Sequence, residues 1–254
     1  MSQTYRLNNV GYINRDKKIS FKFNGKKYFG YKGDTLASAL LANGVHLVGR
    51  SFKYHRPRGF VGAGVDEPNA KVQLYYKGAN TEPNANATEV ELVEGLIARS
   101  QNCWPSVSFD FGAINNLLNK FFPAGFYYKT FMWPKSFWYK IYEPIIRKAA
   151  GLGIAPLKPD PDKYEHKYEY CDVLVVGSGP SGLSSALAAA KNGARVILAE
   201  DKVRFGGSLL TDEVTIGNKK GKEWADEIIS QLKSMPNVIV KNRSQVFGYY
   251  DHNM

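Results

Sequence analysis

The stretch that decides the fold of the second half of the chain is DVLVVGSGPSGLSSALAAAKNGARVILAED, residues 172–201. It begins with a short apolar run, continues through a glycine-rich turn and a helical segment, and ends with a second apolar run and an acid. A nearly all-apolar strand suits the centre of a parallel sheet. The stretch therefore predicts the strand–turn–helix–strand unit of a Rossmann-like dinucleotide-binding domain over residues 170–254.

The turn of this stretch carries the spacing G-x-G-x-x-G. Gly177 permits the tight turn, Gly179 lets the backbone approach a pyrophosphate, and Gly182 lets helix and strand pack closely. The free N–H groups of the helix that follows would face the phosphates, and Ser181 lies in its first turn. These residues predict a phosphate-binding edge.

An acid follows the second apolar run. Glu200 comes 23 residues after Gly177, where a carboxylate accepts hydrogen bonds from the adenosine ribose and repels a 2′-phosphate. NAD or FAD is therefore favoured over NADP. In FGGSLL, residues 205–210, Gly207 lets backbone pass close to a ligand and Ser208 could donate to a phosphate. Such a second glycine element is typical of flavoproteins with two dinucleotide-binding domains and is not expected in a simple dehydrogenase.

Two further segments of this half read as strands. They are NVIVKN, residues 237–242, and SQVFGYY, residues 244–250. The second would lay its backbone near Val246 against the adenine.

The first 104 residues have the pattern of a β-grasp domain. ISFKFNGKKYFGY, residues 19–31, alternates apolar and polar residues around Asn24-Gly25, which is a strong hairpin signal. Asp34 or Thr35 could cap the helix that follows, and Gly44 could end it. Further strands are predicted at KVQLYY, residues 71–76, and ATEVELV, residues 87–93. The overall fold class is thus mixed α/β.

Residues 105–169 form a third region, which combines helical periodicity with many aromatic residues and is broken at Pro123, Pro134 and Pro144. It is too interrupted and too charged to cross a membrane. Two interpretations stay open for its aromatic residues, a contact surface between domains or subunits and the filling of a core within the chain. The polar segment 157–170 ends the region as a linker.

The net charge of +11 is concentrated at one end. Residues 1–60 hold twelve Lys and Arg and two acids, a net charge of +10. The remaining residues hold 22 Lys and Arg and 21 acids, a net charge of +1. A basic end could bind nucleic acid, an acidic partner or a phosphate, or could be a solvated surface. A nucleic-acid-binding motif is not found, and neither a signal core nor an 18-residue apolar run is present.

The chemistry-bearing residues are few and scattered. Two cysteines, Cys103 and Cys171, support neither a zinc site nor a disulfide framework, and they fit a reducing cytoplasm. The four histidines show no triad or metal spacing, and a structural or solvated role is expected for each: His46, His55, His166 and His252. We therefore expect neither catalytic nor metal-binding residues in this chain.

Three stretches together resemble a known family. GRSFKYHRPRGFVGAG, FPAGFYYKTFMWPKSFWYKIYEPIIRKAAGLG and VLVVGSGPSGLSSALAAAKNGARVILAEDKVRFGGSLL are similar, in this order, to the N-terminal part of the α subunit of heterotetrameric sarcosine oxidases. The resemblance covers nearly all 254 residues. It implies an α subunit that binds NAD, and partner β, γ and δ subunits, of which β carries FAD and covalent FMN. It also implies a fragment, since family members continue into a tetrahydrofolate-binding domain.

The resemblance also implies which residues contact NAD. The matching positions hold Ser181, Glu200, Asp201, Lys202 and Ser208. Family members often have Asp-Glu-Arg where this chain has Glu-Asp-Lys, and Thr where it has Ser208. Glutamate reaches further than aspartate, and lysine lacks the bidentate fork of arginine. Small changes in the ribose contacts are expected, with binding retained.

The N-terminal domain resembles a [2Fe–2S] ferredoxin whose cluster is lost. Such a cluster needs four thiolates. The loop SFKYHRPRGFVGAG, residues 51–64, holds none, and the whole chain has two. We expect a scaffold domain in which Arg56 and Arg58 meet a partner surface or polar backbone.

Three functions remain open. The first is the NAD-binding α subunit of a sarcosine oxidase, which oxidises sarcosine to glycine with O2 and passes the one-carbon unit to tetrahydrofolate. The second is an FAD-binding α subunit of a related amine or imino-acid dehydrogenase, of the proline or opine type. The third is a non-catalytic basic binding module.

Overall fold

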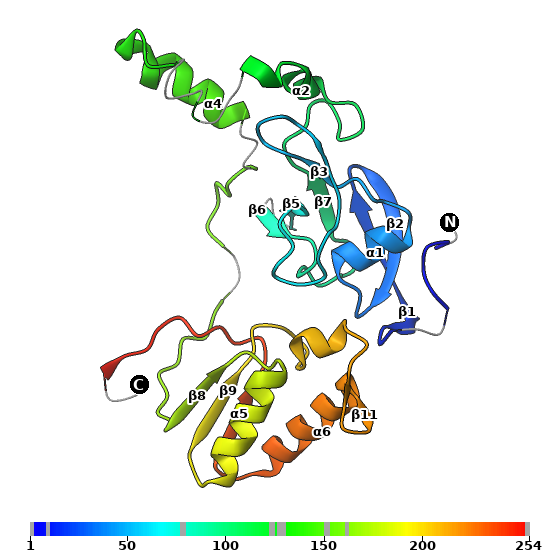
Figure 1. Cartoon of the computed structure of the whole chain (residues 1–254), viewed down its shortest axis with the longest axis vertical. Coiled ribbons are helices and arrows are strands. Elements are labelled where there is room, and N and C mark those ends of the chain that lie inside the picture. The colour runs from blue at the N-terminus through cyan, green and yellow to red at the C-terminus, as the bar shows by residue number, and fades with distance from the viewer. Residues whose placement is uncertain are drawn as a thin grey trace. The chain divides into compact units, whose positions relative to one another are not determined.

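The computed structural model describes residues 3–8, 11–76, 80–121, 125, 131–149, 153–160 and 163–251 of the 254. The chain forms two compact units, residues 1–162 and residues 163–254 (Figure 1). Each unit has its own buried apolar cluster.

The N-terminal unit is built on a five-stranded sheet. The strand order is β2-β1-β7-β5-β6, and only the central pair β1 and β7 is parallel among neighbouring strands. The bounds are β1 Asn14–Phe23, β2 Lys26–Lys32, β5 Lys71–Tyr75, β6 Thr81–Asn86 and β7 Ile97–Ser100. A separate short pair joins β3 Gly49–Arg50 to β4 Pro57–Arg58.

The hairpin predicted around Asn24-Gly25 is confirmed. β1 and β2 pair antiparallel with Phe23 opposite Lys26, and Asn24 and Gly25 have φ of 48° and 81°. Positive φ at both central residues is what a two-residue hairpin turn of this twist requires.

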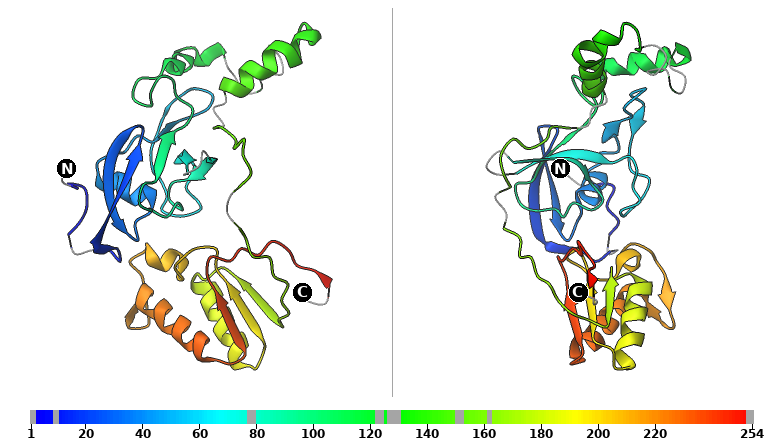
Figure 2. Two further views of the ribbon diagram at one scale, coloured as in Figure 1. Left: turned by 180° about the vertical axis from the view of Figure 1, so that it is seen from behind. Right: turned by 90° about the vertical axis from the view of Figure 1, so that its left-hand side faces the viewer.

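Helix α1, Leu36–Ala42, covers one face of this sheet (Figure 2). Leu36 and Leu40 lie in one buried cluster with Phe21, Phe23 and Leu74 of the strands. Of the two capping candidates, Thr35 is the N-cap, since its side chain accepts from the backbone N–H of Ser38. This capping box satisfies N–H groups that a helix start otherwise leaves unpaired.

The strand predicted at residues 87–93 is wrong. The chain turns at residues 87–89, and only an isolated bridge from Glu91 to Thr35 follows. The apolar alternation arises because Ala87 and Leu92 are buried against the core that contains α1. Their neighbouring N–H and C=O groups bond to the start of α1 rather than to a strand, as in the bonds from Leu36 N to Val90 O and from Leu92 N to Asp34 O.

The aromatic region that follows is helical in short pieces. These are η1 Phe111–Ala113, α2 Ile114–Leu117, η2 Asn119–Phe121, η3 Lys135–Phe137, η4 Trp138–Tyr142 and α4 Glu143–Ala149. Pro123 lies outside the described residues. Within the described part of the chain, none of the helices is long and apolar enough to cross a membrane.

The C-terminal unit contains three parallel strands in the order β12-β9-β8. They are β8 Val173–Val176, β9 Val196–Ala199 and β12 Val238–Lys241. Helices α5 Pro180–Lys191 and α6 Gly221–Ser234 connect them and contact each other (Figure 1). Between β9 and α6 lie η5 Gly207–Leu210 and the small hairpin of β10 Thr215–Ile216 and β11 Lys219–Lys220. The strand–turn–helix–strand unit predicted from residues 172–201 is present.

The second strand predicted after α6, at residues 244–250, is not formed. The segment contacts the stretch that precedes β8 through aromatic rings instead of joining the sheet. The ring of Phe247 lies 5.9 Å from that of His166 and 6.3 Å from that of Tyr168. The apolar residues at 244–250 thus make ring contacts while Phe247, Tyr249 and Tyr250 stay exposed, and they form no ladder.

Candidate functional site

The carboxyl ends of the three parallel strands bring together the segments that the sequence predicted as a nucleotide site. β8 leads into the glycine turn 177–182, β9 leads into Glu200, and β12 leads into residues 242–244. The ends are joined by backbone bonds from Gly177 N to Ala199 O (2.8 Å) and from Ser244 N to Glu200 O (2.9 Å). Ligands of open parallel sheets bind at this edge.

The three glycines of the turn fall into two groups. A Cβ atom on Gly182 would lie 2.1 Å from the carbonyl oxygen of Gly177, so this glycine is needed for the contact between helix and strand. A Cβ atom on Gly177 or Gly179 would meet no protein atom within 4 Å. The backbone of these two residues therefore borders open space, at the N-terminus of α5, where a phosphate is favoured.

Glu200 is buried and its carboxylate is already partly bound. Its Oε2 atom accepts from the backbone N–H of Ser178 (2.9 Å) and from the hydroxyl of the same residue. Its Oε1 atom accepts from the N–H of Lys202 (3.0 Å). Glu200 is 6% exposed and Ser178 is fully buried. These bonds hold the acid at the edge of the sheet in one orientation.

Ser178 also holds the second glycine element. The N–H of Gly206 bonds to the carbonyl oxygen (3.1 Å) and contacts the hydroxyl oxygen (3.2 Å) of Ser178. Gly207 has a φ of 54°, and a Cβ atom there would lie 2.9 Å from Cα of Gly179. The doublet therefore packs directly on the glycine turn, whereas the close approach to a ligand that the sequence predicted stays a prediction. Ser208 is exposed in the single turn η5 that follows.

The remaining predicted residues lie around this edge. Ser181 is exposed in the first turn of α5. Asp201 and Lys202 form an exposed ion pair of 3.1 Å. Burial opposes ionisation of Asp201, but interactions with Glu200 and Lys202 outweigh it and lower the pKa of this carboxyl. Val246 is half-buried in the segment that starts at the bond from Ser244 to Glu200.

Sequence reasoning missed Ser178. It occupies a variable position of the glycine spacing, and the spacing assigns it no role. Only the fold shows that this side chain faces Glu200 and not solvent.

The histidines have structural surroundings where the structure describes them. Nδ1 of His55 lies 2.6 Å from Oδ2 of the buried Asp110, and the ring of His46 packs edge-on against Tyr5. His166 packs on Phe247. His252 lies outside the described residues. Among the described residues, there is no group of three or more His, Cys, Asp or Glu arranged for a metal ion.

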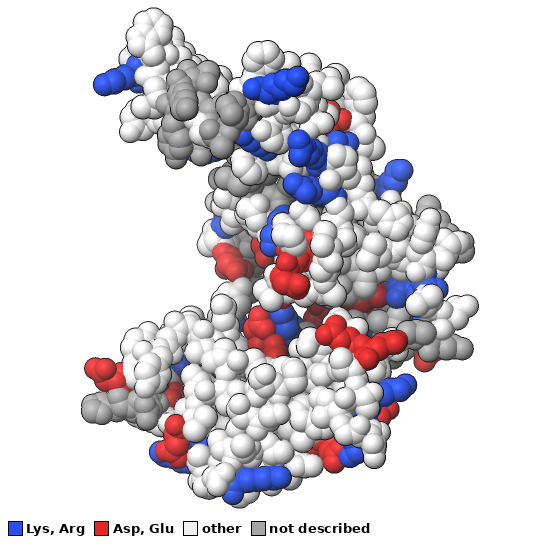
Figure 3. All heavy atoms as spheres, viewed as in Figure 1, with Lys and Arg blue, Asp and Glu red and all other residues white. Residues whose placement is uncertain are grey.

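Several basic side chains of the N-terminal unit are held by the fold. Arg50 donates to the carbonyl oxygens of Val107 (2.8 Å) and His55 (3.0 Å), and Arg56 donates to Oδ1 of Asn116 (2.8 Å). Lys and Arg side chains gather on the visible face around α2 and the loops beside it (Figure 3). A binding role of the basic residues stays a prediction.

Comparison with known proteins assigns a type to each unit. Residues 16–103 match the family described as "2Fe-2S iron-sulfur cluster binding domain", and residues 172–241 match the family described as "FAD dependent oxidoreductase". The sarcosine oxidase subunit alpha of Rhizobium meliloti is 55% identical over 251 residues, which is 99% of this chain and 25% of the relative. The chain resembles the sarcosine oxidase α subunits. This confirms the resemblance predicted from the sequence.

A second α subunit supports the same assignment. The sarcosine oxidase subunit alpha of Corynebacterium sp. (strain U-96) is 31% identical over 95% of this chain and 20% of its own length. The chain thus spans a quarter or less of the length of these relatives.

Among solved structures, L-proline dehydrogenase from P. horikoshii is similar to this chain, with a TM-score of 0.52 and 20% sequence identity. The match covers 94% of this chain and 36% of the solved chain. The fold is mixed α/β with a ferredoxin-like N-terminal domain and an FAD-oxidoreductase-type domain.

The residues of the first unit do not fit an iron–sulfur cluster. The chain has two cysteines, and they lie in different units, Cys103 in the first and Cys171 in the second. Burial raises the pKa of both thiols. A [2Fe–2S] cluster of this domain type needs four thiolates.

The residues of the second unit fit the adenosine and pyrophosphate of a dinucleotide. They offer open backbone at Gly177 and Gly179, free N–H groups at the start of α5, and the oriented carboxylate of Glu200.

Proposed function

We propose that this chain binds NAD at the carboxyl edge of β8 and β9, as the nucleotide-binding part of a heterotetrameric sarcosine oxidase α subunit. The observation that carries the proposal is the open space beside Gly177 and Gly179, next to the oriented acid Glu200. The N–H groups at the start of α5 bind the pyrophosphate, and Ser181 and Ser208 add donors. Asp201, Lys202 and Val246 border the adenosine. NAD, when bound, supplies a hydride acceptor.

The oxidation itself belongs to partner subunits in this proposal. The β subunit carries FAD and covalent FMN and oxidises sarcosine to glycine with O2, and γ and δ complete the complex. The one-carbon unit goes to tetrahydrofolate, held by a region of the longer α subunits that this chain does not span. The proposal is supported by 55% identity to a sarcosine oxidase subunit alpha. The N-terminal domain serves as a scaffold without a cluster, in the cytoplasm.

A second candidate is FAD in place of NAD. It is favoured by the match of residues 172–241 to the family described as FAD-dependent oxidoreductases. The chain would then itself carry electrons, as part of an amine or imino-acid dehydrogenase. Glu200 serves both candidates equally, since both nucleotides have an unphosphorylated adenosine ribose.

Gly179→Ala tests the site without disturbing the fold. Gly179 has a φ of −65° and a ψ of 179°, which alanine adopts freely, and the added methyl meets no protein atom. The methyl would occupy the space of the pyrophosphate, so we expect NAD affinity to fall by about 10- to 100-fold with an unchanged melting temperature. Ser184→Ala, on the exposed side of α5, is the matched control. Full NAD affinity in a folded Gly179→Ala protein would refute the proposed site.

A further inference from the structure

The contacts of Glu200 leave its two carboxylate oxygens in different states. An ionised carboxylate offers about two acceptor sites on each oxygen. Oε2 accepts from both the N–H and the hydroxyl of Ser178, so its sites are filled. Oε1 accepts from the N–H of Lys202. The neighbouring carboxyl of Asp201 has a lowered pKa and is therefore ionised near neutral pH, so it donates nothing to Glu200 and one site on Oε1 remains. The acid therefore has room for one more donor and not for two.

The surroundings of Ser178 fix this asymmetry. Ser178 is fully buried, and its hydroxyl cannot turn to solvent. The hydroxyl oxygen receives the N–H of Gly206, which leaves its own hydrogen for Glu200. The hydroxyl of Ser178 thus accepts a hydrogen bond from the glycine doublet and donates one to Glu200.

We infer that Ser178 is a positioning residue that makes Glu200 recognise one adenosine ribose hydroxyl, through Oε1, instead of both. The inference rests on the proposed function, because it concerns the adenosine half of the dinucleotide. It adds to that function the idea that Ser178, without contacting the nucleotide, determines how many ribose hydroxyls Glu200 binds.

The test uses ADP, 2′-deoxy-ADP and 3′-deoxy-ADP, which carry the half that NAD and FAD share. Affinities are measured by calorimetry on the full-length protein freed of bound nucleotide. We expect one analogue to bind about 10- to 100-fold more weakly than ADP, because a bond to a charged acceptor is lost, and the other to bind within about threefold of ADP. Equal losses for both analogues would overturn the inference.

Variants of Ser178 separate positioning from mere support of the fold. Ser178→Ala removes the hydroxyl donor and frees a site on Oε2, so the ratio between the two analogues should move toward one. Ser178→Cys, a weaker donor of similar size, should give an intermediate ratio, and Ser184→Ala should leave the wild-type ratio unchanged. A loss of ADP affinity in Ser178→Ala with an unchanged ratio would show a structural role only. If the wild-type protein binds none of the three nucleotides, the proposed function fails.

Discussion

At the scale of single residues, a carboxylate organises the loop where the ferredoxin-like domain lacks its cysteines. Glu67 is 1% exposed, and its two oxygens accept four backbone N–H groups. Val61 and Gly62 donate to Oε2 (both 2.6 Å), and Asn69 and Ala70 donate to Oε1 (2.7 and 3.3 Å). Burial alone would raise the pKa of Glu67, but these bonds outweigh it and hold the pKa below the ordinary 4.5.

Glu67→Gln should therefore destabilise the N-terminal unit. An amide offers one acceptor atom where the carboxylate offers two, so buried N–H groups lose their partner, at a cost of about 1–3 kcal/mol in free energy of unfolding at pH 7. A lowered pKa in the fold means that the stabilisation is present above pH 4.5 and is lost as the pH falls through the folded pKa. The urea unfolding midpoints of wild type and variant should thus approach each other below pH 4.5 and converge only below the folded pKa of Glu67.

Glu94→Gln is the control for this prediction. Glu94 is exposed and accepts one backbone N–H, from Ser20 (2.8 Å). At pH 7, Glu94→Gln should lower the free energy of unfolding by much less than Glu67→Gln does. Equal effects of the two variants, or a difference that persists at low pH, would contradict the role of Glu67.

Residues with a fixed spacing could be predicted from the sequence, and residues defined by burial could not. Gly177, Gly182 and Glu200 follow from the geometry of a strand–turn–helix unit, which is the same wherever it occurs. Ser178 and Glu67 act through contacts with segments 28 and six residues away, at Gly206 and Val61. The sequence around a polar residue in a turn or loop does not indicate which distant backbone group it will bond to.

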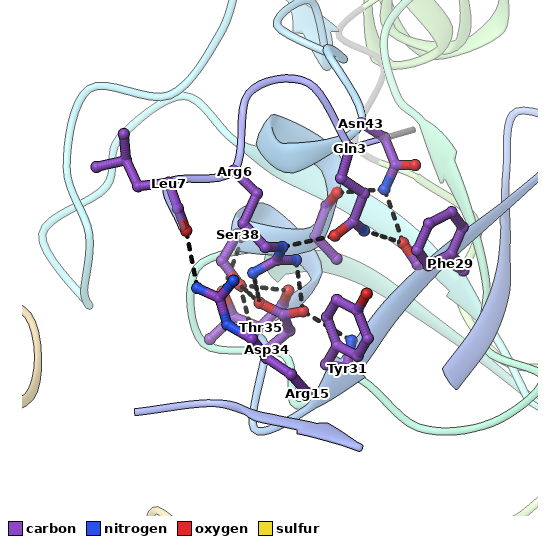
Figure 4. Close-up of polar contacts among 11 residues, drawn as sticks. Gln3, Arg6, Leu7, Arg15, Phe29, Tyr31, Asp34, Thr35, Ser38 and Asn43 are labelled. Carbon is purple, nitrogen blue, oxygen red and sulfur yellow. Dashed lines mark hydrogen bonds and ion pairs between the residues drawn. The ribbon is translucent and has the colours of Figure 1, made fainter. Parts of the chain in front are cut away.

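At the scale of elements, a buried ion pair ties the N-terminal segment to α1. The guanidinium of Arg6 donates to both oxygens of Asp34, at 3.1 and 2.8 Å (Figure 4). Asp34 is 2% exposed and also accepts from the N–H of Tyr31 (2.8 Å) and the hydroxyl of Ser38 (2.7 Å). The aspartate next to the cap thus anchors a distant segment instead of capping the helix.

Arg6→Ala should leave the charge of Asp34 buried without its cation. Removing one partner of a buried pair costs roughly 3–5 kcal/mol in free energy of unfolding. A urea unfolding transition at lower concentration would report this loss. Lys32→Ala, which removes an exposed cation at the end of β2, should change stability by less than about 0.5 kcal/mol. Similar stability of Arg6→Ala and wild type would show that the pair contributes little.

The elements that the sequence predicted correctly carry local signals. Asn24-Gly25 defines the hairpin, and the glycine turn defines β8 and α5. The segments 87–93 and 244–250 alternate like strands but lie outside the sheets. In segment 87–93 the alternation reflects burial against the core beside the start of α1, not a neighbouring strand. In segment 244–250 the aromatic rings make ring contacts but stay exposed, so the alternation there does not report burial.

At the scale of the whole molecule, a ferredoxin-like domain and an FAD-oxidoreductase-type domain are joined in one chain, and we propose that the first holds no cluster. Large apolar side chains stay exposed in its helical region, among them Leu117, Phe121, Trp133 and Tyr139. Of the two interpretations that the sequence left open for this region, such exposure favours a contact surface over the filling of a core, and the contact surface stays a prediction.

The N-terminal unit should bind neither iron nor acid-labile sulfide. The reason is that two thiolates in separate units cannot hold a [2Fe–2S] cluster. Elemental analysis of this chain, purified anaerobically, measures both. Two irons per chain, with sulfide in equal amount, would contradict the scaffold role of the N-terminal unit.

The measurement that tests the central claim most directly is the identity of the bound nucleotide. Full-length protein is purified intact and denatured, and the released small molecules are identified by mass. Our account predicts NAD held by this chain, with flavin only on its partners. FAD released from the isolated chain would contradict the assignment of NAD and support the second candidate. A folded chain that releases no dinucleotide and takes up neither NAD nor FAD would contradict the proposed site itself.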